Sequence, residues 1–98
     1  MNKGPRCCDI NLTPLVKALK ALSEENRLKI ICLLKKSEKC VCKIGEFLNL
    51  PHNLICHHLK KLTKIKILIS TKKGNFTYYK INNKEYKKLL KEINCLLN

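Results

Sequence analysis

The chain has 98 residues, enough for one domain, and its 21 Lys and Arg against seven Asp and Glu give a formal net charge of +14. This charge favours a polyanionic partner, such as nucleic acid or an anionic membrane, over the simpler alternative of a soluble, lysine-rich surface. No stretch reaches the roughly 18 apolar residues of a membrane span, and the start, MNKGPRCCDI, lacks the apolar core of a signal peptide. We therefore expect a cytoplasmic protein.

Seven cysteines stand out in so short a chain. In the reducing cytoplasm they are expected as thiols or thiolates rather than as disulfides. Seven is also an odd number, so a complete set of disulfides within one chain is impossible. Thiolate chemistry is the better explanation of the cysteine content.

The first half of the chain predicts a flexible arm followed by three helices. Residues 1–11 contain the adjacent Cys7 and Cys8 and are expected to form the arm, while residues 12–98 form the folded domain. Apolar residues recur at helical spacing over 13–21, and Ser23 is the expected N-cap of a second helix that runs to about Lys36. The polar run KKSEK separates it from a short third helix, which ends near Asn49.

The second half predicts a helix, a hairpin and a last helix. Pro51 suits the first turn of a helix whose apolar face is formed by Leu54, Ile55, Leu59 and Leu62. Two β-prone runs within ILISTKKGNFTYYKI flank a glycine that allows a tight reversal, and a helix over 84–97 follows Asn82 or Asn83 as its cap. A short helix, a turn, a polar-faced helix and a hairpin predict a mainly α (α+β) winged helix-turn-helix.

In such a fold the second helix of the helix-turn-helix enters the major groove with its first residues near the bases. The candidates for base contacts are His52, Asn53 and His57. The candidates for phosphate or wing contacts are Lys60, Lys61, Lys64, Lys72, Lys73 and Asn75, with a solvated surface as the alternative. A metal ion shared by His57 and His58 is not expected, because adjacent helical residues point about 100° apart.

Four segments, in order, resemble the ArsR/SmtB family of winged-helix metalloregulators. LKALSEENRLKIICLL resembles the opening helices of the family, and EKCVCKI resembles its metal box. LPHNLICHHLKKL resembles its recognition helix, and KKGNFTYYKI resembles its wing. The resemblance runs from about Leu19 to Asn82.

The resemblance implies a homodimeric repressor that binds double-stranded operator DNA and is released by a toxic ion. It places Cys40 and Cys42 on the metal-box positions and adds Cys56 to the recognition positions. Some residues depart from the family pattern. Pro51-His52 replaces Ser-Gln, Cys56 replaces Ser, and Lys43 replaces an acidic residue. Lys66 stands where a glycine usually ends the recognition helix, so a less regular turn is expected there.

The Cys40-Val41-Cys42 segment is the expected ion site. Within a helix, residues two apart point about 200° apart, but in an extended or fraying segment they point the same way. Two thiolates are too few for zinc or cadmium, which take about four ligands, or for trivalent arsenic, which bonds three sulfurs. The arm is expected to supply Cys7, Cys8 or both, as an N-terminal arm does in the cadmium- and lead-sensing branch of the family.

An all-sulfur site selects soft ions: As(III), Sb(III), Cd, Pb or Zn. The family's other common site uses Asp and His on the last helix, which NKEYKKLLKEINCLLN lacks.

Three alternatives remain open. Cys40 and Cys42 could simply pack in the core. A thiol-redox or persulfide sensor could use Cys32 and Cys95, which fall near positions used by some relatives. A DNA-binding protein without an inducer could hold structural zinc. An enzyme is not expected, because no catalytic set or phosphate-cradling glycine loop is present.

Overall fold

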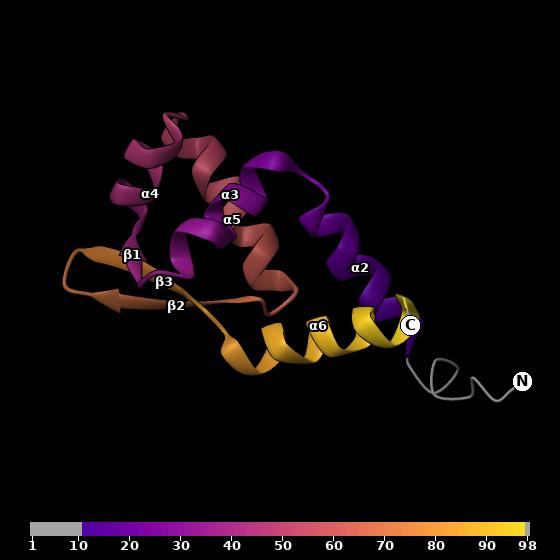
Figure 1. Cartoon of the computed structure of the whole chain (residues 1–98). Helices are drawn as coiled ribbons and strands as arrows, with labels where there is room; N and C mark the ends of the chain where they lie inside the picture. Colours follow the sequence, from indigo (N-terminus) through magenta and orange to yellow (C-terminus); the bar gives the residue numbers. More distant parts are fainter. Residues whose placement is uncertain (1–10, 98) are drawn as a thin grey trace, which may run out of the picture.

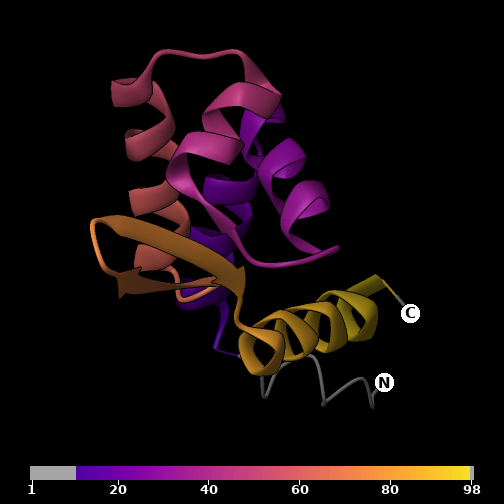
Figure 2. The ribbon, with the colours of Figure 1, turned by 90° about the vertical axis from the view of Figure 1, so that its left-hand side faces the viewer.

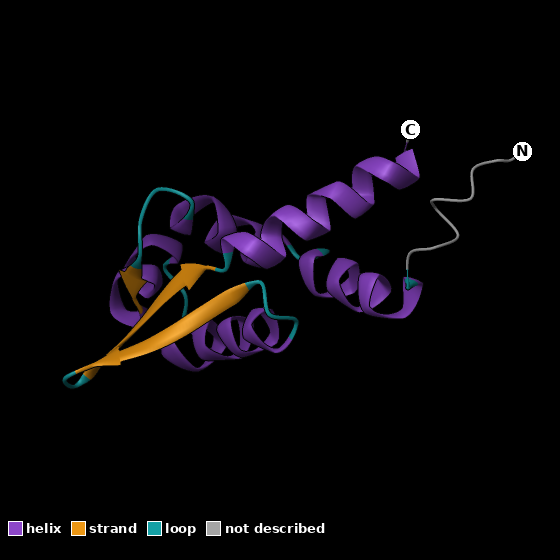
Figure 3. Ribbon diagram, turned by 90° about the horizontal axis from the view of Figure 1, so that it is seen from below, coloured by secondary structure: helices purple, strands orange, loops and turns teal. Residues whose placement is uncertain are grey.

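The computed structural model describes residues 11–97, which form five helices and a three-stranded antiparallel sheet (Figures 1 and 3). The elements, in chain order, are α2 (Leu12–Leu22), α3 (Glu25–Leu34), β1 (Lys39–Cys40), α4 (Val41–Leu48), α5 (His52–Lys64), β2 (Leu68–Lys73), β3 (Phe76–Ile81) and α6 (Asn83–Leu97). Helices α4 and α5 form the helix-turn-helix, and the β2–β3 hairpin forms the wing. The winged helix-turn-helix expected from the sequence is confirmed.

Side-chain oxygens cap the N-terminal ends of three helices. Asn11 accepts a hydrogen bond from the backbone N–H of Thr13, and the Asn82 side chain accepts one from Glu85. The prediction that Ser23 caps α3 is wrong. Glu24 is the N-cap and its carboxylate accepts from the N–H groups of Asn26 and Arg27, whereas the Ser23 hydroxyl donates back to the carbonyl of Lys20. The longer Glu24 side chain carries a full negative charge to the positive end of α3.

One core joins all the helices. Its fully buried members come from α3, α4, α5 and the start of β2, and they include Ile30, Ile44, Ile55, Leu59, Leu62 and Leu68. Leu15 of α2 and Leu89 of α6 add to this core from the ends of the chain. Figure 1 shows that α2 and α6 lie at the end of the molecule opposite the wing.

The wing sheet has an edge strand that the sequence did not predict. The strand order is β1-β3-β2, with Lys39 opposite Tyr79 and Cys40 opposite Tyr78. In the hairpin, Leu68 pairs with Ile81 and Lys73 with Phe76, around a turn in which Gly74 has a φ of 62°. Figure 2, viewed from the wing side, shows the hairpin in front of the helical body.

Lys66 ends the recognition helix in a regular way, contrary to the expectation of a less regular turn. It adopts a φ of 67°, its N–H bonds to the carbonyl of Thr63 at 2.9 Å, and the N–H of Ile67 bonds to the carbonyl of Leu62 at 3.1 Å. These two hydrogen bonds define a Schellman motif, which usually has glycine at the left-handed position. Lys66 therefore adopts a left-handed backbone conformation that usually requires glycine, and its Cβ makes this conformation sterically unfavourable.

Two predictions concern residues that the structure does not describe: the flexible arm up to Ile10, and the ion ligands Cys7 and Cys8. The last residue assigned to the arm, Asn11, is instead the N-cap of α2. Between residues 11 and 97, no helix combines the length and the apolar character that crossing a membrane requires.

Candidate DNA interface and ion site

The outward face of α5 carries the residues predicted to read DNA. Ile55, His58, Leu59 and Leu62 are buried on its inner face. On the opposite face, Asn53, His57, Lys60 and Lys64 follow one another at spacings of four, three and four residues, and all four are exposed. His52, Lys61 and the half-buried Cys56 flank this row, and the Cys56 sulfur lies 3.3 Å from Nε2 of His52.

At the wing tip, Lys72, Lys73 and Asn75 are exposed. Lys73 also has a role within the protein. Its Nζ lies 2.8 Å from the Glu38 carboxylate and 4.9 Å from the centre of the Tyr78 ring. These contacts tie the end of β2 to the segment just before β1, so Lys73 positions the wing as well as adding positive charge to it.

His57 and His58 have separate roles, as the angle between them predicts. His57 is exposed, whereas His58 is buried and accepts a hydrogen bond at Nδ1 from Nε of Arg27, at 3.1 Å. Arg27 also donates to the carbonyl of Ala21, and Nε2 of His58 lies 3.9 Å from the Glu24 carboxylate. This network fixes the start of α3 against α5. The sequence did not predict this network, because its only visible sign was a histidine near the apolar face of a helix.

Cys40 and Cys42 converge at the start of α4. Cys40 is extended, with φ −79° and ψ 160°, and serves as the N-cap, while Cys42 lies in the first turn. Their sulfurs are 2.7 Å apart. The sequence predicted that the two cysteines point the same way if their segment is extended or lies at a helix start. They do so because Cys40 belongs to the extended strand β1 and Cys42 to the first turn of α4.

The two thiols differ in environment and in pKa. Cys40 is buried and Cys42 is exposed. The hydrogen bond between the two side chains and the backbone N–H of Lys43 lower the pKa of Cys40 by more than burial raises it. The same side-chain hydrogen bond, burial and the charge of Cys40 raise the pKa of Cys42. The pair therefore releases its first proton more readily than an isolated cysteine does.

The thiol pair is an incomplete ligand set. Within residues 11–97, no group of three or more Cys, His, Asp and Glu side chains comes together in a way that could hold a metal ion. Any further sulfur must come from Cys7 or Cys8, outside this range, or from another molecule. The predicted redox residues lie on different helices: Cys32 is exposed on α3, and Cys95 is half-buried on α6.

Comparison with known proteins gives two kinds of similarity. A family model described as "Bacterial regulatory protein, arsR family" matches residues 24–69. The cadmium resistance transcriptional regulatory protein CadC of Listeria innocua is 41% identical over 73 residues, which cover 72% of this chain and 61% of the relative. The arsenical resistance operon repressor of Bacillus subtilis is 32% identical over 79 residues, which cover 80% of this chain and 75% of the relative. This chain therefore spans less than two thirds of the length of the cadmium regulator.

Among solved structures, the homodimeric winged helix-turn-helix domain Mb0332 of Mycobacterium bovis superposes with a TM-score of 0.74. The match covers 88% of this chain and 80% of that domain at 22% identity. Identity this low shows a shared fold, which agrees with the order of helices and strands described above.

Proposed function

Because the chain belongs to the ArsR family of bacterial regulatory proteins, we propose that it is a cytoplasmic, homodimeric repressor released from operator DNA by a thiophilic ion. The family and the fold are those of DNA-binding transcriptional regulators, not of enzymes. The proposal has three parts: a dimer, a DNA-reading surface and an ion site made of cysteine thiolates.

The dimer is proposed to form through α2 and α6. Both helices expose apolar side chains: Leu12, Val16 and Leu19 on α2, and Leu90, Leu96 and Leu97 on α6. Leu97 is 82% exposed, which is unfavourable in an isolated monomer. Pairing these helices between two copies would bury the apolar faces and place two recognition helices on one duplex. The domain from M. bovis is itself described as homodimeric.

DNA is proposed to lie against the outward face of α5 and the wing tip. Asn53 and His57 are exposed near the start of the helix, where base edges are usually read. Lysines on the same face and on the wing would bind phosphates, so affinity should fall steeply with salt concentration.

The ion is proposed to bind Cys40 and Cys42, with Cys7, Cys8 or both completing the site. The observation that carries this proposal is the convergence of the two cysteine side chains at the start of a helix. When two thiolates bind one tetrahedral zinc ion at about 2.3 Å, their sulfurs are roughly 3.8 Å apart. The two side chains therefore lie close enough together to share one ion. As(III), Cd, Pb and Zn all suit such a donor set.

The position of the thiols suggests how they could affect DNA binding. Cys40 belongs to β1, which pairs with β3 of the wing, and Cys42 belongs to the first helix of the helix-turn-helix. An ion held by both sulfurs would therefore link the wing strand to the helix-turn-helix and alter their relative position. An ion that binds this altered form more tightly shifts the population away from the DNA-binding form.

The test is an anaerobic titration of the reduced, full-length protein with Cd²⁺ and then with arsenite. Thiolate-to-metal absorbance in the ultraviolet reports binding, and fluorescence anisotropy of a labelled duplex, selected from a random pool, reports release. We expect stoichiometric absorbance and release in the wild type. The variant Cys40→Ser/Cys42→Ser should bind DNA normally but lose both responses.

Cys32→Ser/Cys95→Ser is the matched control, since it also removes two cysteines, and it should respond like the wild type. If the Cys40/Cys42 variant is still released by both ions, the proposed ion site is wrong. If peroxide or polysulfide releases the wild type but not the Cys32/Cys95 variant, the redox alternative is correct.

A further inference from the structure

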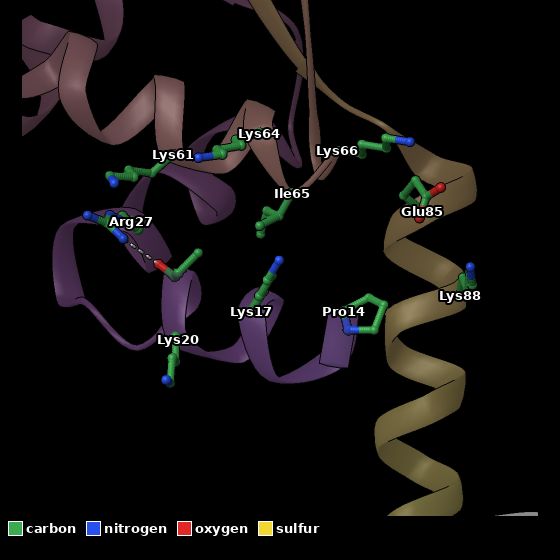
Figure 4. A pocket seen from close by; sticks show the side chains of 11 residues that line it. Pro14, Lys17, Lys20, Arg27, Lys61, Lys64, Ile65, Lys66, Glu85 and Lys88 are labelled. Atoms are coloured by element: carbon green, nitrogen blue, oxygen red, sulfur yellow. Dashed lines mark hydrogen bonds between the residues drawn. The ribbon is translucent and has the colours of Figure 1, made fainter. Parts of the chain in front are cut away.

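A strongly cationic pocket lies beside the C-terminal end of the recognition helix (Figure 4). It has a volume of about 670 Å³, and its walls come from α2, the start of α3, the end of α5 and the start of α6. Seven cationic side chains line it, namely Lys17, Lys20, Arg27, Lys61, Lys64, Lys66 and Lys88, together with one carboxylate, Glu85. The pocket could not be predicted from the sequence, because these residues come from four separate segments.

The lysines of the pocket have no acidic partners among residues 11–97. The four ion pairs found there involve other cations: Lys29, Lys43, His58 and Lys73. Arg27 is held in place by its bonds to His58 and to the carbonyl of Ala21, the bond drawn in Figure 4. Figure 4 shows the Lys17 side chain pointing toward Ile65, whereas the ends of Lys20, Lys66 and Lys88 point away from the centre of the pocket. The lysines therefore form a positively charged surface around the pocket, and such a surface attracts a polyanion.

The pocket is continuous with the DNA-reading face. Lys64 is the last member of the outward row that begins with Asn53, and Lys64 also lines the pocket with its neighbour Lys61. The opposite walls, α2 and α6, are the helices whose exposed apolar faces are proposed to pair in the dimer. In a dimer, the two pockets would therefore lie between the two recognition helices.

We propose that this pocket binds backbone phosphates of the central operator segment, between the two half-sites. This inference rests on the proposed function and extends it, because it adds Lys17, Lys20, Lys66 and Lys88 to the residues that contact DNA. The contacts are made to phosphates and not to bases, so they should strengthen binding to all sequences and fix the spacing between the two recognition helices.

The test compares Lys17→Gln/Lys20→Gln/Lys88→Gln with the wild type on a selected duplex over a range of salt concentrations. Each lysine that contacts a phosphate contributes about 1 to the salt slope of log K, so the slope should fall by about 3 for each subunit. The matched control Lys29→Gln/Lys36→Gln/Lys80→Gln removes the same charge from exposed positions elsewhere and should change the slope far less.

A second measurement locates the contacts. Methylphosphonate linkages that neutralise the central phosphates should weaken wild-type binding but weaken the pocket variant little further. Neutral linkages under the wing should weaken both proteins equally. Equal salt slopes for the two triple variants, or no difference between central and outer linkages, would overturn the inference. Wild-type binding to the unmodified duplex would still support the proposed function.

A third measurement separates the operator backbone from a free anion. Tripolyphosphate at constant ionic strength is titrated into the protein, and binding is followed by thermal shift. Weak binding, lost in the pocket variant and competing with DNA, supports the proposal. Tight binding that leaves DNA affinity unchanged would assign the pocket to a free polyphosphate ligand instead.

Discussion

At the scale of the residue, the burial of His58 makes the stability of the protein depend on pH. Burial lowers its pKa, and the positive charges of Arg27 and His57 add to this effect, while the Glu24 carboxylate opposes it. The folded state therefore binds this proton less readily than the unfolded state does. As the pH falls below about 6.5, the unfolded state takes up the proton first, so the free energy of unfolding decreases.

We expect the reduced, metal-free protein to lose stability between pH 7.5 and 5, and His58→Gln to remove most of this dependence. The measurement is urea unfolding followed by circular dichroism at several pH values. His57→Gln is the comparison, because that neighbouring histidine is exposed and makes the smallest contribution to the lowered pKa of His58, so most of the dependence should remain. An unchanged pH profile in His58→Gln would show that other groups are responsible.

At the scale of the element, the residue that ends α5 has an unfavourable backbone conformation, and one substitution can relieve it. Lys66 has a φ of 67°, a conformation that disfavours residues with a Cβ by about 1–2 kcal/mol. Lys66→Gly should therefore raise the free energy of unfolding by about 1 kcal/mol, after the greater flexibility of glycine in the unfolded state is included.

Thermal and urea unfolding would measure this gain. Lys60→Gly, at an exposed position within the helix, should instead lower stability by about 1 kcal/mol. If both substitutions destabilise the protein, the left-handed conformation of Lys66 is not the source of the cost. The same Lys66→Gly variant also removes one charge from the cationic pocket, so it should be more stable and yet bind DNA less tightly.

The sequence predicted the helices well and the junctions between elements less well. Repeating apolar residues identified all five helices, and the β-prone runs around Gly74 identified the wing. Strand β1 was missed because Lys39-Cys40 is too short to show any periodicity, and its partner Tyr79 is 40 residues away. The approach of Cys40 and Cys42 was anticipated, but the cause, a strand that joins directly to a helix, depends on pairing across the chain.

At the scale of the whole molecule, the exposed apolar faces of α2 and α6 predict a dimer. Burying one leucine contributes about 1.5–3 kcal/mol, and a two-fold interface buries each residue twice. Leu90→Glu should therefore raise the dimer dissociation constant by about 100-fold or more, as measured by sedimentation equilibrium.

Phe47→Glu provides the comparison, because Phe47 is 62% exposed on α4 and lies outside these two helices. It should leave the dimer intact. A monomeric wild type would contradict the proposed interface, and dissociation of both variants would place part of the contact on α4.

The pairing of β1 with β3 also has a consequence for the order of folding. Lys39 and Tyr79 are distant in the chain, so their pairing closes a long loop, whereas contacts between successive helices close short ones. We therefore expect β1 to join the sheet late. During synthesis, Cys40 and Cys42 leave the ribosome before β3 exists to pair with β1. Newly made chains then expose both thiols before the wing is complete. An ion could therefore bind them at a stage when the protein cannot yet bind DNA.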